Sequence, residues 1–105
     1  MRWWKTRHRH HNFVGVVSLD MTVDPTAHLA RRELVLLGTG GKPKWLKFAC
    51  PCRCGEIIAL NLMGSYSPRW SVQQDSAGSI SVSPSVDSTT CGAHFFIRHN
   101  RVEWC

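Results

Sequence analysis

The sequence lacks any apolar run that approaches the roughly 18 residues of a membrane-spanning helix. The apolar stretch nearest the start, Phe13 to Leu19, is too broken to serve as the core of a signal peptide. We therefore expect a cytoplasmic protein, in which reducing conditions favour thiolates on a metal over disulfides. The odd count of five cysteines agrees with this expectation, because full disulfide pairing would leave one thiol over.

Acidic residues are absent from the first ten positions, although the whole chain carries seven. The cations of this segment are Arg2, Lys5, Arg7 and Arg9. They supply four of the six net positive charges, so the rest of the chain is nearly balanced. Residues 1–12 show neither a helical nor a strand period and are predicted to form a flexible basic arm. The remaining residues, 13–105, suffice for a single domain with one modest core.

Helical patterns are scarce. Asp24-Pro25 offers an N-cap followed by proline at the first helical position, which predicts one or two turns over residues 25–32. Short runs of strand character, many with an apolar period of two, occur at 13–20, 33–37, 45–50, 58–62, 69–73, 80–83, 93–98 and 101–104. His99-Asn100 between the last two runs predicts a hairpin turn. We predict a mostly β fold, either a small antiparallel sheet or a partly open barrel, with one zinc-knuckle site and at most one short helix.

The chain does contain a split group of sulfur and imidazole ligands. Cys50-Pro-Cys-Arg-Cys-Gly55 is followed by Cys91-Gly-Ala-His94, with 36 residues between Cys54 and Cys91. Two thiols from one turn and a Cys-x-x-His from another can hold one tetrahedral zinc ion. Alternate thiols of a regular strand lie roughly 6.6 Å apart, so the strand must break into a turn, which Gly55 permits. The predicted ligands are Cys52, Cys54, Cys91 and His94, with Cys50 as an alternate for either of the first two.

Two other interpretations of these residues have less support from the sequence. Free cysteines are among the most buried residues, and His94 could be a hydrogen-bonded core imidazole, but five candidate ligands in two tight groups favour a metal. A catalytic zinc keeps an open position for water, whereas three cysteines and one histidine fill the coordination sphere. The His-x-Glu of zinc deaminases is also absent. We therefore expect a structural zinc ion and no enzyme activity.

Several segments together resemble a family of small bacterial proteins. They are Leu34 to Trp45, Phe48-Ala-Cys-Pro-Cys-Arg-Cys-Gly-Glu-Ile57, Trp70, Ser81-Val-Ser-Pro-Ser-Val86, Cys91-Gly-Ala-His-Phe-Phe-Ile-Arg98 and Val102-Glu-Trp104. The family pattern is Cys-Pro-Cys-Gly-Cys-Gly, then Pro-Ser-Ile or Pro-Ser-Val, then Cys-x-x-His-Phe and a final Trp. This chain departs from it at Arg53, where glycine is usual, without losing a ligand. The resemblance covers residues 34–105 and implies a zinc-binding β domain often encoded near ubiquitin-like modifier and conjugation genes, but no particular activity.

The function predicted first is that of a protein-binding adaptor, which could serve a ubiquitin-like conjugation or removal system. Trp45 or Phe95, if exposed, would be its anchors, because aromatic side chains dominate the binding energy of interfaces. An alternative is nucleic-acid binding, in which cations contact phosphates and aromatic rings stack on bases. The residues for that role are Arg2, Trp3, Trp4, Lys5, Arg7 and Arg9. A third is a cysteine-dependent enzyme that uses Cys105 or a thiol of the cluster as its nucleophile.

Overall fold

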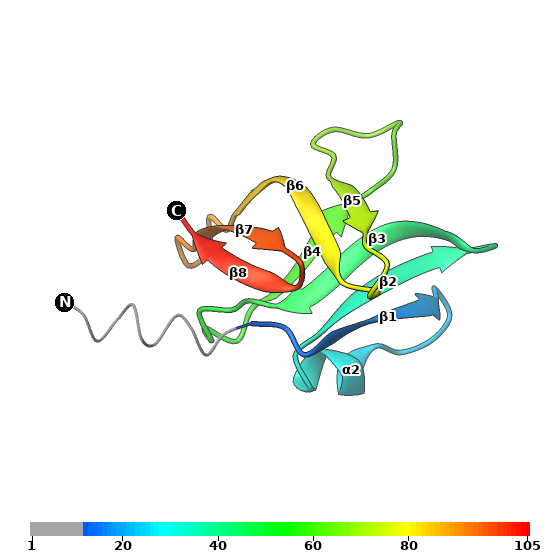
Figure 1. The fold of residues 1–105 in the computed structure, drawn as a ribbon, viewed down its shortest axis with the longest axis horizontal. Coiled ribbons are helices and arrows are strands. Elements are labelled where there is room, and N and C mark those ends of the chain that lie inside the picture. The colour runs from blue at the N-terminus through cyan, green and yellow to red at the C-terminus, as the bar shows by residue number, and fades with distance from the viewer. Residues whose placement is uncertain (1–11) are drawn as a thin grey trace.

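The computed structural model describes residues 12–105, which form two four-stranded sheets and one short helix (Figure 1). The first sheet contains β1 (Gly15–Asp20), β2 (Glu33–Thr39), β3 (Lys42–Ala49) and β4 (Ile57–Asn61), in that spatial order. The second contains β5 (Ser71–Gln74), β6 (Ile80–Asp87), β7 (His94–Arg98) and β8 (Arg101–Trp104). The mostly β class with one short helix is confirmed. Neither sheet closes into a barrel over the range 12–105.

The first two strands are parallel, which a purely antiparallel sheet would not contain. β1 pairs with β2 from Gly15↔Glu33 to Asp20↔Gly38, and the connection between them carries α2 (Thr26–Ala30). Parallel neighbours need such a crossover, whereas antiparallel ones can be joined by a tight turn. All other strand pairs are antiparallel. Within residues 12–105 no helix is long and apolar enough to span a membrane.

The two sheets share one hydrophobic core. Phe48 of β3 and Phe95 of β7 are fully buried, and their ring centroids lie 6.2 Å apart across the interface. Phe13 packs edge-on against Phe48 at 5.2 Å, and its backbone N–H donates to the carbonyl of Asn100. Because Phe95 is fully buried, it cannot be the exposed anchor that an adaptor would need, and that prediction is wrong for this residue.

A second, smaller cluster covers the other side of the first sheet. Leu29 of α2 packs with Val35 and Leu37 of β2, and the half-buried Trp45 lies against them. In Figure 1, α2 lies on the side of the first sheet that faces away from β5–β8. β2 is therefore covered on both faces, which explains why its apolar run is continuous rather than alternating. Trp45 contributes to this cluster and is only partly accessible to a partner.

The hairpin predicted at His99-Asn100 is confirmed. It joins β7 to β8, and both residues adopt left-handed backbone conformations, with φ of 50° and 65°. Two successive positive φ values are typical of the type I′ turns that match the twist of a two-stranded ribbon. Asn12 contributes to this end of the molecule, because its side-chain oxygen accepts the backbone N–H of Val102. The rest of the predicted basic arm, residues 1–11, lies outside the described residues.

Asp75 links the β5–β6 turn to the β7–β8 turn and gives the fold a pH-dependent contact. Its carboxylate lies 2.8 Å from His99 Nδ1 and accepts the backbone N–H groups of Ala77 and Ser79. These bonds, the one to His99 foremost, hold the pKa of Asp75 below its ordinary value of 3.8. A pKa depressed in the folded state stabilises the fold above the unfolded pKa, and that stabilisation is lost as the pH falls through the folded pKa.

We therefore expect Asp75→Asn to lower the urea midpoint of unfolding near neutral pH. The difference from the wild type should shrink as the pH falls below 3.8, where the wild-type carboxyl group also becomes protonated. Parallel urea titrations of the two proteins from about pH 6 to about pH 2 measure this difference. A difference that stays constant over that range would contradict the proposed role of the carboxylate.

Candidate metal centre and serine–histidine pair

Four cysteine sulfurs converge between the two sheets. The Sγ atoms of Cys50, Cys52, Cys54 and Cys91 all lie within 4.8 Å of one another. The Sγ of Cys50 lies 3.3 Å from that of Cys52 and 3.6 Å from that of Cys91. Thiolates bound to one tetrahedral zinc at about 2.3 Å would have sulfurs about 3.8 Å apart. The cluster therefore has the dimensions of a site that could hold one metal ion.

A tight turn after β3 brings the first three cysteines together. The Cys50 N–H donates to the Glu56 carbonyl at 2.8 Å, and the Arg53 N–H donates to the Cys50 carbonyl at 3.0 Å. Arg53 and Gly55 both have positive φ, 67° and 92°. This left-handed backbone breaks the strand period, as the Cys-x-Cys-x-Cys spacing requires. Arg53 thus adopts a conformation that glycine would adopt at lower cost.

The fourth sulfur comes from the loop between β6 and β7. The Gly92 N–H donates to the Ser88 carbonyl and the Ser88 N–H donates to the Ala93 carbonyl, each at 2.8 Å. Cys91 stands at the tip of this closed loop, with its Sγ 3.4 Å from Ser88 Oγ. A metal bound by all four sulfurs would therefore fasten the β6–β7 loop of the second sheet to the β3–β4 loop of the first.

The thiols differ in acidity because their surroundings differ. Burial raises the pKa of Cys50 well above its ordinary value and also raises the pKa of Cys52. In contrast, hydrogen bonds with the Ser88 side chain and the Ala93 backbone lower the pKa of the exposed Cys91 thiol to about 6. Thiolates, not thiols, bind metals. Cys91 is thus more acidic than Cys50 and Cys52, which would lose their protons on metal binding.

His94 lies outside the sulfur cluster. It is the first residue of β7, in which Phe95 and Ile97 fill the core face, so its side chain points to the opposite, exposed face. The structure brings Cys50, rather than His94, to Cys52, Cys54 and Cys91. The arrangement thus differs from the predicted ligand set at one position, and which residues coordinate a metal stays a prediction.

The imidazole of His94 instead faces a serine on the neighbouring strand. Its Nε2 lies 3.0 Å from the Oγ of Ser85 in β6. With Nε2 as the acceptor, the Ser85 hydroxyl donates the hydrogen bond. This separation is within the range of about 2.6–3.2 Å that is typical of a nucleophile and its general base. Ser85 is half-buried and His94 is exposed, so a substrate can reach both side chains.

An irregularity in the second sheet positions Ser85. Between the pairs Val82↔Ile97 and Val86↔Phe95, four residue steps on β6 span only two on β7. A bulge of this kind redirects side chains and occurs often beside active sites. The indole Nε1–H of Trp70 donates to the Ser85 carbonyl at 3.2 Å and fixes the bulged backbone.

The sequence interpretation missed Ser85 as a functional residue. It lies in a serine-rich strand, where hydroxyl side chains are ordinarily read as the solvent-facing positions of a sheet. A signal was nevertheless present, because Pro-Ser-Val and Cys-x-x-His both belong to the family pattern quoted above. Such a linear pattern does not report that a bulge brings Ser85 and His94 within hydrogen-bonding distance.

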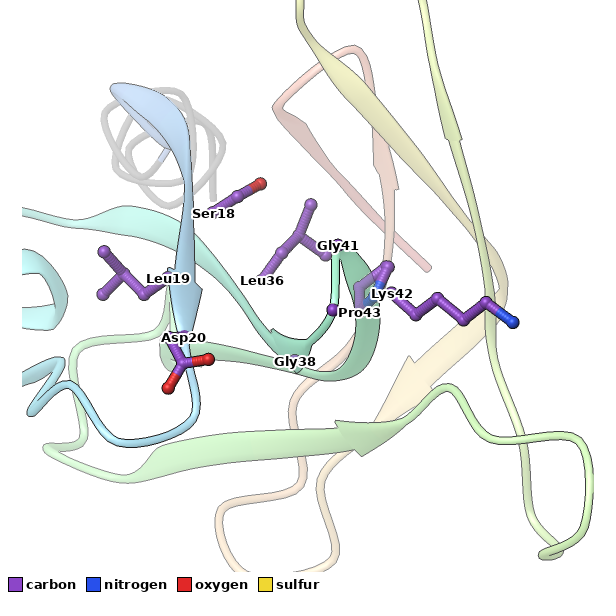
Figure 2. Close-up of a pocket in the computed structure, with 9 residues that line it drawn as sticks. Ser18, Leu19, Asp20, Leu36, Gly38, Gly41, Lys42 and Pro43 are labelled. Atoms are coloured by element: carbon purple, nitrogen blue, oxygen red, sulfur yellow. The ribbon is translucent and has the colours of Figure 1, made fainter.

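A hollow of about 230 Å³ elsewhere in the molecule carries no comparable chemistry (Figure 2). It lies between the end of β1 and the β2–β3 hairpin. The carboxylate of Asp20 there is held by the Thr22 hydroxyl at 2.6 Å and the Thr22 N–H at 3.0 Å, which lowers the pKa of Asp20. Lys42 extends away from Asp20 in Figure 2. The Ser85–His94 pair is therefore the stronger candidate for catalysis.

Comparison with known proteins finds one family. The sequence model of a family described as "Bacterial ubiquitination-like system serine protease (BubE)" matches residues 21–105. That range includes the four clustered cysteines, Ser85 and His94. No curated protein and no solved structure matches the chain.

Proposed function

Because the chain belongs to the BubE family of bacterial ubiquitination-like systems, we propose that it is a serine protease with Ser85 as nucleophile and His94 as general base. The observation that carries the proposal is the 3.0 Å separation of Ser85 Oγ and His94 Nε2 across two neighbouring strands. The family description supports it, since it names this class of enzyme. The proposal departs from the expectation of a non-enzymatic protein, which nothing described here tests.

The geometry supports acyl transfer through the serine. Ser85 Oγ would attack the carbonyl carbon of the scissile bond while His94 Nε2 takes the hydroxyl proton. The same nitrogen then donates this proton to the leaving amine, and an acyl-enzyme forms on Ser85. A water molecule, deprotonated by His94, releases the acyl group and restores the hydroxyl. Asp87 is the residue opposite His94 in the β6–β7 register and could support the imidazolium formed during each step.

The cysteine cluster would serve this mechanism by holding a zinc ion. Cys50, Cys52, Cys54 and Cys91 are an all-sulfur set typical of closed, structural zinc sites, in which no position is left for water. A zinc ion bound there would cross-link the loops and stabilise the fold. Cys91 lies only three residues before His94. The residues that bind the metal would therefore also restrain the strand that carries the general base.

The substrates we propose belong to the ubiquitination-like system of the family description. A serine protease in such a system would cleave a peptide or isopeptide bond that follows the C-terminal tail of a ubiquitin-like protein. An adaptor of the same system, the role expected from the sequence, would also bind these components. The Ser85–His94 pair favours hydrolysis over adaptor function, because an adaptor has no need of a serine beside an imidazole. Nucleic-acid binding rests on Arg2 to Arg9, outside the described residues, and has no support here.

A fluorophosphonate probe, which reacts with activated serines, tests the proposal. We expect the wild-type protein to be labelled at Ser85, as mapped by mass spectrometry of proteolytic fragments. Ser85→Ala and His94→Ala should both remove the labelling, because the nucleophile or its base is lost. Ser71→Ala, an exposed serine of β5, is the matched control and should leave the labelling intact. Absence of labelling in the folded, metal-loaded wild type would contradict the proposal.

A further inference from the structure

One edge of the first sheet is open. β4 is the last strand of that sheet and pairs only with β3 among the described strands. The Leu62 N–H donates to Lys44 and the Cys50 N–H donates to Glu56, so positions 56, 58, 60 and 62 hydrogen-bond to β3. The alternate residues Ile57 and Ala59 therefore point their backbone N–H and C=O groups away from β3. These groups form a template for another extended chain.

A strand of the second sheet lies opposite this edge. β6 pairs with β5 only as far as Ser83. Its final residues therefore pair with β7 on one side and with no described strand on the other. Between them and β4 lies a hollow of about 220 Å³, which we call the β4–β6 groove. Its lining residues are Glu56 to Leu60, Trp70 and Val86 to Thr90.

The groove adjoins the backbone of the proposed nucleophile, although the Ser85 and His94 side chains do not line it. Trp70 lines it and also donates its indole N–H to the carbonyl of Ser85. Val86, which lines the opposite wall, follows Ser85 directly in the chain. A peptide that lies along β4 would thus reach the Ser85–His94 pair at the Trp70 end.

The charge of the groove indicates what such a peptide carries. Its lining includes two acids, Glu56 and Asp87, and no lysine, arginine or histidine, although the whole chain has a net charge of +6. Glu56 Oε1 is buried and has no hydrogen-bond partner among the described residues. Glu56 as a whole is half-buried and lines the groove, so its carboxylate and that of Asp87 complement a cationic side chain of a ligand.

We propose that the β4–β6 groove binds the substrate as an added strand on the edge of β4, with an arginine or lysine side chain of the substrate against Glu56. This inference rests on the proposed function and specifies its substrate as an extended, basic peptide segment beside the scissile bond. Main-chain hydrogen bonds to Ile57 and Ala59 supply the affinity in this mode, and the acidic pocket supplies the selectivity.

Binding can be measured without cleavage in the Ser85→Ala variant. The probe is a fluorescein-labelled octapeptide of alternating valine and threonine with one central arginine, followed by fluorescence anisotropy. We expect replacement of its arginine by glutamine to weaken binding about tenfold, as loss of one charge-assisted hydrogen bond implies. N-methylation of one alternate set of its backbone nitrogens should abolish binding. The ¹⁵N-resolved amide signals of Ile57 and Ala59 should shift on peptide addition.

Glu56→Gln, made in the Ser85→Ala background, should remove the preference for arginine while leaving the metal content unchanged. Glu103→Gln is the matched control, because this acid lies on β8 outside the groove, where it pairs at the surface with Arg98. It should keep the full preference. No binding at about 1 mM peptide, binding insensitive to both N-methylated sets, or an arginine preference that survives Glu56→Gln would each overturn the inference.

The outcomes separate this inference from the proposed function. If the peptide binds with these signatures but fluorophosphonate does not label Ser85, the groove stands and the serine protease proposal fails. If Ser85 is labelled but binding ignores Glu56→Gln and backbone methylation, the protease proposal stands and the groove fails.

Discussion

Ser85→Ala is expected to lower kcat/KM for cleavage of a substrate of the ubiquitination-like system by about 10³-fold or more. The loss should be this large because the acyl-enzyme cannot form without the hydroxyl. His94→Ala should have a similar effect, since the Ser85 hydroxyl is a weak nucleophile without a base 3.0 Å away. The double variant should be little worse than either single variant, because the two groups act as a unit. Single-turnover cleavage of a fusion to a ubiquitin-like protein measures all three.

The fold should tolerate both substitutions, which makes the comparison interpretable. His94 is exposed and Ser85 is half-buried, and neither belongs to the shared core. Thermal unfolding and metal content should therefore match the wild type. Activity that persists in Ser85→Ala, or losses that multiply in the double variant, would show that these residues do not act together as nucleophile and base.

Removal of the metal is expected to have the largest effect on stability. A structural zinc contributes about 10 kcal/mol in small zinc-binding peptides, which is comparable with the whole stability of about 5–15 kcal/mol of a domain. We expect one zinc ion per chain by elemental analysis. After chelation, or in Cys50→Ser, we expect the chain to be unfolded already near room temperature. Circular dichroism should then show no cooperative unfolding transition on heating. Cys50 is the sharpest choice, because it is both buried and central to the sulfur cluster.

Two further variants distinguish the possible ligand sets. His94→Ala should retain its zinc if the four sulfurs bind the ion, and should lose it if His94 is a ligand as the sequence predicted. Cys105→Ser should also retain its zinc, because Cys105 is exposed and outside the sulfur cluster. Protein that is free of zinc yet fully folded would contradict a structural metal altogether.

Local signals in the sequence predict most strands and turns of this fold. They are wrong for the end of β6, which continues through Pro84 to Asp87 instead of ending at residue 83. The alternating pattern around Leu46 and Phe48 and the His99-Asn100 turn depend on neighbouring residues only. The helix starts one residue later than predicted, at Thr26, with Pro25 as its N-cap and no side-chain cap. The division into two sheets depends on long-range packing, such as Phe48 against Phe95, and no local pattern reports it. The parallel pairing of β1 with β2 is a similar case, because nothing in either strand specifies its partner.

The candidate site divides in the same way. The cysteines were identifiable because close spacing and a Gly turn bring thiols together locally. The placement of His94 was not, because its direction follows from Phe95 and Ile97 filling the core face of β7. The role of Ser85 was the least predictable from the sequence. Its contact with His94, nine positions later in the chain, depends on the irregular pairing of β6 with β7.

The order of the elements also sets when the proposed Ser85–His94 pair can form during synthesis. Strands β1 to β4 precede β5 to β8 in the chain, so the first sheet can pair before the second leaves the ribosome. The ribosome adds 36 residues between Cys54 and Cys91, which takes roughly 2–7 s. His94 follows three residues after Cys91. Ser85, Cys91 and His94 are thus added to the chain within ten residues of one another. If the proposal is right, a nascent chain cannot hydrolyse a substrate before Cys91, the last of the four clustered cysteines, has been made.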